Sequence, residues 1–288
     1  MTHTFLRRAG LALGFAFLSA APLTAQTATS NQPDYAAAMH REHMNDTPTA
    51  SAGAKIAPRM AVTGESVVYA TVDGKEIRGY LAKPTNFKSG PAVVMVHEWW
   101  GLNDNIKAMA DRYAGEGYAV LAVDLFGGQV ATTPDAAMKL YQAGMANVPA
   151  GEKNVATAVQ YLRSHGATSV GTVGYCFGGH WSLRTALAAG KGVNATVIYY
   201  GAPITDATQI AKLQSPVLGI FGGKDTGIPL DSVRAMEAQI KKAGKPVTIE
   251  VYANANHAFA NPTGQAYDKA AAEDSFKKVM AFYKANLK

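Results

Sequence analysis

The single cysteine of the chain lies in a setting that is typical of a catalytic nucleophile. Cys176 stands between Gly174 and Gly178, directly after an apolar run that ends in TVGY. Glycines on both sides of a reactive residue permit the sharp strand-to-helix turn called a nucleophile elbow. The start of the following helix also favours a thiolate, because its free N–H groups and its dipole stabilise negative charge. The motif therefore predicts a reactive sulfur, with a buried structural cysteine as the alternative.

An acid and a histidine follow the cysteine along the chain. Asp225 lies in GGKDTGIP and His257 lies in NANHAFAN. The order nucleophile, acid, histidine is that of the α/β-hydrolases, in which the acid orients the histidine and the histidine acts as the base. An aspartate beside glycine is also common in ordinary turns. His97 and His180 adjoin candidate site residues, so we expect them to line the site without serving as its base.

The chemically capable residues each follow a predicted buried strand. Glu98 comes after PAVVMVH, and Cys176, Asp225 and His257 follow three later apolar runs. Strands that alternate with helices indicate an α/β fold with a mainly parallel, doubly wound sheet and helices on both faces. Reactive groups gather at the carboxyl ends of such strands. We also expect a β-hairpin around residues 73–74 and helices over residues 103–115, 132–146, 152–165, 230–243 and 267–287.

The first residues resemble an export signal. Arg7 and Arg8 precede a short apolar run that Pro22 interrupts, and small residues follow it. This pattern predicts a signal peptide over residues 1–25, a low-complexity tether over 26–63 and one domain over 64–288. We therefore expect an exported, periplasmic protein that is not inserted in the membrane after cleavage. An uncleaved anchor is the alternative, and the sequence does not decide between the general secretory and twin-arginine routes.

The tether contains a segment, DYAAAMHREHMNDTP, that can form a short helix with Asp34 as its N-cap. His40 and His43 lie there beside Met39 and Met44, a combination that can bind copper. Two histidines three residues apart are a weak metal signal without further ligands. The sequence favours a solvated or docked helix and no metal.

The charge of the chain indicates no nucleic-acid partner. Its 27 Lys and Arg residues exceed its 21 Asp and Glu residues, but they are scattered singly and form no basic run. The glycines around Cys176 lack the lysine and the spacing of a phosphate-binding loop. A nucleotide cofactor is therefore not expected.

Five motifs in order resemble the dienelactone hydrolase family of carboxymethylenebutenolidase-like α/β-hydrolases: HEWWGLN, DLFGG, GYCFGG, FGGKDTGIP and NHAFAN. The resemblance spans residues 65–288. It implies an α/β-hydrolase fold without a lid domain and a monomer that needs no cofactor or metal. It also implies that a triad of Cys176, His257 and Asp225 hydrolyses a small-molecule ester or lactone through a thioester.

The resemblance gives roles to further residues. Glu98 would take the thiol proton when substrate arrives, and the thiol would stay neutral until then, away from the histidine. The backbone N–H groups of Phe177 and Trp99 would form the oxyanion hole. Gly128 and Asn261 stand where well-known members of the family carry arginines that hold a substrate carboxylate. Dienelactone itself is therefore not the expected substrate, because neither residue replaces a guanidinium.

Aromatic residues near these motifs suggest an apolar or aromatic acyl pocket, with Trp100 and Phe126 as its candidate lining beside Trp99 and Phe177. Such residues also serve ordinary packing. A non-catalytic ligand-binding or thiol-redox protein on the same scaffold is the alternative function. The lone thiol and the missing arginines support that alternative.

Overall fold

The computed structural model describes residues 1–2, 35–46, 48, 56–72 and 74–288. Residues 3–25 of the predicted signal peptide, the proposed N-cap Asp34 and parts of the tether lie outside these residues. Asp34–Lys288 form one compact unit. Its helices are α1 (Tyr35–His43), α2 (Asp104–Ala114), α3 (Pro134–Ala146), α4 (Val148–Ser164), α5 (Phe177–Ala189), the 3-10 helix η2 (Gly190–Gly192), α6 (Ala207–Ile210), α7 (Leu230–Lys242) and α8 (Lys269–Asn286).

A mainly parallel sheet runs through this unit, as the sequence predicts. Its strands are β1 (Val62–Val72), β2 (Lys75–Pro84), β3 (Gly90–Val96), β4 (Ala119–Val123), β5 (Ala167–Tyr175), β6 (Ala195–Tyr199), β7 (Val217–Gly222) and β8 (Val247–Tyr252). They lie in the order β1-β2-β4-β3-β5-β6-β7-β8. The predicted hairpin is present, since Val72 pairs with Lys75 across the turn. β2 is antiparallel to β4. The remaining pairs, β4–β3, β3–β5, β5–β6, β6–β7 and β7–β8, are parallel.

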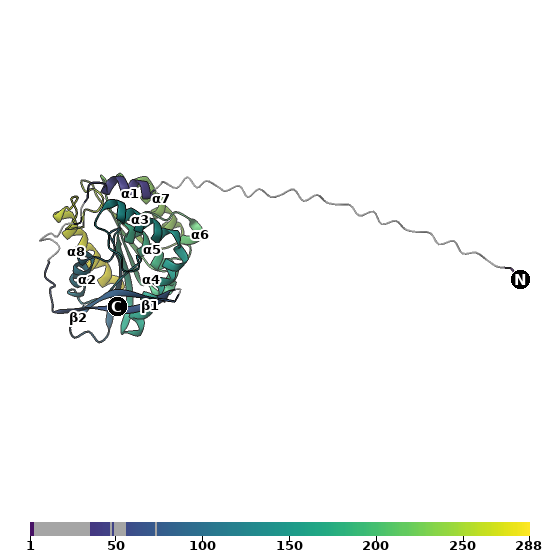
Figure 1. Ribbon diagram of the computed structural model, residues 1–288, viewed down its shortest axis with the longest axis horizontal. Coiled ribbons are helices and arrows are strands. Elements are labelled where there is room, and N and C mark those ends of the chain that lie inside the picture. The colour runs from purple at the N-terminus through teal and green to yellow at the C-terminus, as the bar shows by residue number, and fades with distance from the viewer. Residues whose placement is uncertain (3–34, 47, 49–55, 73) are drawn as a thin grey trace. The chain divides into compact units, whose positions relative to one another are not determined.

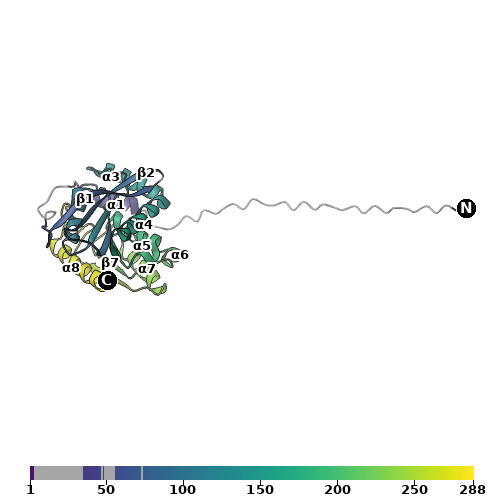
Figure 2. The same ribbon diagram turned by 90° about the horizontal axis from the view of Figure 1, so that it is seen from below.

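Helices cover both faces of the sheet (Figure 1). α2 and α8 lie on one side of it and α4 and α5 on the other, and Figure 2 shows α8 opposite α4 and α5 from below. The central strands β4 and β6 are buried along their whole length, which requires their residues to be apolar on both faces. The sequence shows this as continuous apolar runs instead of alternation.

Helix boundaries follow local capping. Asn103 accepts a hydrogen bond from the N–H of Ile106 and begins α2. Asn147 ends α3 and at the same time caps α4, because its side chain accepts from Ala150. α4 therefore begins at Val148, four residues before the predicted start at residue 152.

The helix in the N-terminal segment does form. α1 packs against α3, and its Met39 belongs to the hydrophobic core. Figure 1 shows α1 in purple beside α3, above the edge of the sheet. None of the helices in the described part of the chain is long and apolar enough to cross a membrane.

Candidate active site

The structure places the four chemically capable residues just beyond the carboxyl ends of four parallel strands. β3 ends at Val96, β5 at Tyr175, β7 at Gly222 and β8 at Tyr252. Glu98, Cys176, Asp225 and His257 follow within one to five residues of those ends and are all buried. The parallel register brings them to one edge of the sheet.

The turn at Cys176 has the geometry of a nucleophile elbow. Cys176 has φ 55° and ψ −117°, a strained conformation for a residue with a side chain. A Cβ on Gly174 would lie 1.9 Å from the carbonyl oxygen of Gly178, and one on Gly178 would lie 2.2 Å from that of Val96. Only glycine fits at either position. Phe177 begins α5, so its N–H lies in the first helical turn, where no intrahelical acceptor exists.

His257 is held by Asp225. Its Nδ1 donates to Oδ2 of Asp225 at 2.6 Å, while Oδ1 accepts from the N–H groups of Gly227 and Ile228 at 2.9 and 2.8 Å. These bonds fix the proton of the neutral imidazole on Nδ1 and leave Nε2 as an acceptor. Burial favours the neutral ring, but Asp225 and then the Cys176 sulfur outweigh it and raise the pKa of His257 well above its usual range.

Helix α1 covers the thiol. Sγ of Cys176 lies 3.7 Å from Sδ of Met39 and 4.0 Å from Nε2 of His43. Cys176 is 3% exposed, and the cavity beside it has a volume of about 10 Å³, room for about one water molecule. The site is therefore closed in this structure, and the space beside the sulfur must widen before an ester can reach it.

His43 mirrors the arrangement of His257. Its Nδ1 donates to Oδ2 of Asp46 at 2.8 Å, and its ring lies 4.7 Å from that of Trp99 and 5.2 Å from that of His257. Burial favours the neutral ring, but the hydrogen bond to Asp46 and the contact with Cys176 raise the pKa of His43 to about 9.

The two imidazoles change the ionisation of the thiol. Burial alone opposes a thiolate, but His257 and then His43 stabilise the charge and lower the pKa of Cys176 to about 6. The family resemblance implies a neutral thiol away from the histidine. The structure differs: it places Cys176 beside two imidazoles that favour its ionised form.

Sequence reasoning did not find His43 as a site residue. It grouped His40 with His43, but His40 faces away from the site and contacts Asp135 on α3 at 3.3 Å. The available signal was the spacing of four between Met39 and His43, which places both side chains on one face of a helix. Both are 3% exposed.

Glu98 points to Asn261. Its Oε2 accepts from Nδ2 of Asn261 at 2.6 Å, and Oδ1 of Asn261 accepts from Asn105 and from the backbone and hydroxyl of Thr263. Burial, and next the Cys176 sulfur, raise the pKa of Glu98 to about 8, so the carboxyl is mainly protonated at neutral pH. Asn261, a candidate for the substrate pocket, positions Glu98 here and is 4% exposed.

The family assignment follows from this fold and from a direct match. The sequence model of the dienelactone hydrolase family matches residues 77–287. The chain belongs to the dienelactone hydrolase family. The resemblance read from the five motifs is confirmed.

Relatives of this hydrolase cover most of its domain. "Protein usf" of Aquifex pyrophilus is 33% identical over 223 residues, which are 75% of this chain and 96% of the relative. A protein of Saccharolobus solfataricus named "Putative carboxymethylenebutenolidase" is 31% identical over 256 residues, covering 76% and 97%. The family and these relatives identify the chain as a hydrolase of esters or lactones, acting on small molecules.

Solved structures confirm the α/β-hydrolase fold. A dienelactone hydrolase-like promiscuous phosphotriesterase from metagenomic libraries superimposes with a TM-score of 0.73 at 24% identity, covering 79% of this chain and 100% of that one. A dienelactone hydrolase structure from Klebsiella pneumoniae gives 0.70 at 24% identity, covering 78% and 99%. α1 precedes the family match, so the family model accounts for Cys176 and His257 but not for His43.

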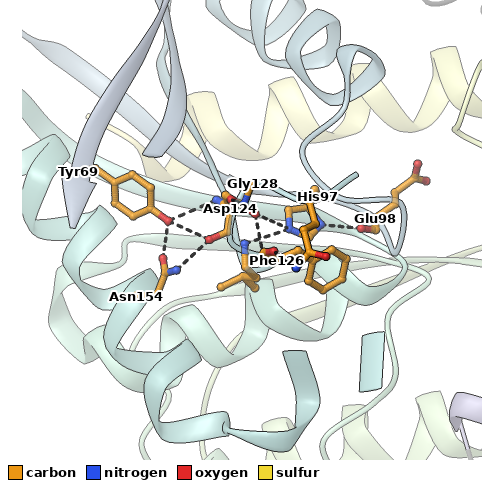
Figure 3. A network of polar contacts seen from close by, with 9 residues as sticks. Tyr69, His97, Glu98, Asp124, Phe126, Gly128 and Asn154 are labelled. Atoms are coloured by element: carbon orange, nitrogen blue, oxygen red, sulfur yellow. Dashed lines mark hydrogen bonds and ion pairs between the residues drawn. The ribbon is translucent and has the colours of Figure 1, made fainter. Parts of the chain in front are cut away.

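A polar network holds the turn that carries Glu98 (Figure 3). His97 donates from Nδ1 to the carbonyl of Glu98 at 2.6 Å and accepts at Nε2 from the N–H of Leu125. Asp124 accepts from the N–H groups of Phe126 and Gly128. In Figure 3 the Glu98 carboxyl points away from this network. Both ring nitrogens of His97 serve this scaffold, and burial lowers its pKa, so it stays neutral and is not available as a base.

His180 is also occupied. Its Nδ1 donates to the carbonyl of Ala202 at 2.9 Å, and its Nε2 accepts from Nε of Arg184 at 2.8 Å. Burial, and then the Arg184 charge, lower the pKa of His180 to about 4. A second nitrogen of Arg184 binds Glu152, so Arg184 forms no link between Cys176 and Glu98 among its described contacts.

The other predicted site residues are three aromatic residues that pack around the site and Gly128, which lines another cleft. Trp99 follows Glu98 and contacts His43, and Trp100 packs on Trp99 with ring centroids 5.0 Å apart. Phe126 packs against Phe177 and His97. Gly128 lines a different cleft of about 410 Å³ together with residues of β1 and β2. The structure therefore places Gly128 away from the cavity beside Cys176.

Among the described residues, the side chains that are grouped closely enough to hold a metal ion are those of the candidate active site. Ligand atoms of His43, Cys176 and His257 lie within 4.8 Å of one another. A thiolate and two imidazoles are donors that suit zinc or copper. The same three groups also suit proton transfer between sulfur and nitrogen.

Replacing Met39 by alanine should open the site. Met39 packs on Cys176 and lies against Gly227, so truncation removes part of the contact that holds α1 down. A buried Met→Ala change costs about 2–5 kcal/mol, and part of this cost appears as easier opening. We expect N-ethylmaleimide to label Cys176 about 10-fold faster, since about 1.4 kcal/mol corresponds to a factor of ten.

Met44→Ala is the matched control, because Met44 follows the same helix and is exposed. Its labelling rate should equal that of the wild type. Equal rates for Met39→Ala and the wild type would contradict the covering role of α1. The rates are measured by mass spectrometry at one pH.

Proposed function

We propose that the protein is an exported, cysteine-dependent hydrolase of carboxylic esters or lactones that acts through Cys176, His257 and Asp225. The observation that carries this proposal is the Asp225–His257 couple. Nε2 of His257 has no hydrogen-bond partner among the described residues and lies within 4.8 Å of the Cys176 sulfur. Export rests on Arg7, Arg8 and the apolar run after them.

The reaction has two halves. The Cys176 thiolate attacks the ester carbonyl carbon, and the resulting tetrahedral intermediate collapses to a thioester as the alcohol leaves with a proton from His257. Neutral His257 then takes a proton from water, the hydroxide attacks the thioester, and the acid leaves as the thiolate is restored. Asp225 stabilises the imidazolium in both halves.

The oxyanion is stabilised by two backbone N–H groups in this proposal. Phe177 offers the free N–H of the first turn of α5, and Trp99 offers the N–H after Glu98. Both donors are fixed by the elbow and by the His97 network, so they need no rearrangement when charge develops on the carbonyl oxygen.

The substrates we propose carry an uncharged acyl group. The cavity beside Cys176 is lined mainly by apolar side chains, among them Tyr141, Met145, Phe177 and Ile228. His180 contributes to the lining in its neutral form, and the lining residues include no arginine or lysine. A substrate carboxylate would therefore lose its hydration without gaining a partner.

A burst experiment tests the proposal. The enzyme is mixed with an excess of a p-nitrophenyl ester of a neutral aromatic acid, and the first turnover is followed by absorbance and by mass spectrometry after acid quenching. We expect a burst of about one p-nitrophenol per chain and an acyl mass on the peptide that contains Cys176. Esters and lactones that carry a carboxylate should react more slowly than their neutral analogues. An acyl group on another residue, or a preference for anionic substrates, would contradict the proposal.

A further inference from the structure

Two imidazole–carboxylate couples converge on one sulfur. Asp225 holds His257 at 2.6 Å and Asp46 holds His43 at 2.8 Å, in both cases through Nδ1. In each couple Nε2 is the nitrogen left to face Cys176, and the three reactive atoms lie within 4.8 Å of one another. One couple is enough for a triad, so the second requires its own explanation.

We propose that His43 of helix α1 is a catalytic residue that accepts the proton of the Cys176 thiol, and that Asp46 positions it. The proposal rests on the proposed hydrolase function and assigns a further residue to that site. The proton leaves Sγ for Nε2 of His43, which yields a thiolate and an imidazolium. His257 is already protonated, because its pKa lies well above the usual range, and it gives its own proton to the leaving alcohol.

The geometry favours His43 over Glu98 in this role. Nε2 of His43 is a hydrogen-bond neighbour of Sγ at 4.0 Å, whereas Oε2 of Glu98 accepts from Asn261. The ionisable groups around His43 are Asp46, Cys176, His257 and Glu98.

The position of His43 is fixed by the docking of α1. The backbone carbonyl of Asn45 accepts from Gln265 at 3.0 Å, and Glu42 accepts from the hydroxyl of Thr226. Met39 supplies the apolar contact on the same helix face. These contacts reach the loops that carry Asp225 and His257, so α1 docks on the same loops that position two residues of the proposed triad.

The test measures the acidity of the thiol without using turnover. The full-length protein is dialysed against a chelator, so that no metal ion occupies the three donor atoms. The rate of alkylation of Cys176 by iodoacetamide is then measured by mass spectrometry from pH 4.5 to 10. A lowered thiol pKa gives the wild type an inflection near pH 6, since alkylation needs the thiolate and its rate falls as pH drops through that value.

We expect the inflection to move up by one pH unit or more in His43→Gln and by a smaller amount in Asp46→Asn. His40→Gln is the matched control: this histidine lies on the same helix and faces Asp135, so its inflection should stay at the wild-type value. Asp46→Asn also keeps the test decisive if His43→Gln does not fold, because it leaves the His43 ring in place.

Two results would overturn the assignment. One is an unchanged inflection in both His43→Gln and Asp46→Asn. The other is an upward shift in Glu98→Gln that exceeds the shift in His43→Gln, which would give the acceptor role to Glu98. A shifted inflection in a protein without ester turnover would leave this assignment intact and contradict the hydrolase proposal instead.

Discussion

Replacing Cys176 by alanine is expected to lower kcat for a neutral aryl ester by about 10⁴-fold or more, because the enzyme then lacks the atom that forms the acyl intermediate. The remaining rate would come from the oxyanion donors and from binding alone. Cys176→Ser should recover only a small part of the loss. A serine hydroxyl is far less acidic than a thiol, and a buried site with two imidazoles is suited to a thiolate.

The measurement compares kcat and the melting temperature of the wild type and both variants. The cavity beside the sulfur has a volume of only about 10 Å³, so neither substitution leaves a large void. Both variants should therefore fold and melt close to the wild type. Ester turnover that persists in Cys176→Ala at a substantial fraction of the wild-type rate would contradict the thiol mechanism.

Asp225→Asn should lower kcat by about 10⁴-fold through the tautomer of His257. Oδ1 of Asp225 accepts from the N–H groups of Gly227 and Ile228, so the amide oxygen of an asparagine has to occupy that place. Its NH₂ group then faces Nδ1 of His257, which must become an acceptor. The ring proton moves to Nε2, and the nitrogen that faces Cys176 can no longer take a proton.

Asp206→Asn is the matched control for this change. Asp206 caps α6 through the N–H of Gln209 and is exposed, whereas Asp225 is buried. Asparagine caps a helix as well as aspartate does, so kcat and stability should both be unchanged. If Asp225→Asn retained more than about a tenth of the wild-type kcat, His257 would not depend on Asp225 for its tautomer.

The parts of the site that the sequence predicted depend on local patterns. Continuous apolar runs mark the buried strands, and parallel strands bring the residues after them to one edge, so Glu98, Cys176, Asp225 and His257 could be placed together before any coordinates. Capping residues such as Asn103 similarly mark where helices begin. The fold class followed from the same patterns.

The parts that the sequence did not predict are contacts between distant residues. Met39 and Cys176 are 137 residues apart, and Glu98 and Asn261 are 163 apart. A nine-residue helix has too few turns to show which surface it will dock on, and in isolation it would be marginal. Asn261 was read as the absence of an arginine, whereas the structure shows what its amide does: it holds a buried carboxyl.

The helix over Cys176 also bears on how long the enzyme keeps its nucleophile. A thiolate is the form that peroxide oxidises, first to a sulfenic acid and then irreversibly, and the proposed export would expose the protein to oxidants without the reducing systems of the cytosol. The site thus combines a sulfur that is ionised at neutral pH with almost no access to solvent. Each opening of the site that admits an ester also admits an oxidant, so the lifetime of the thiol is set by the fraction of time that the site is open without substrate.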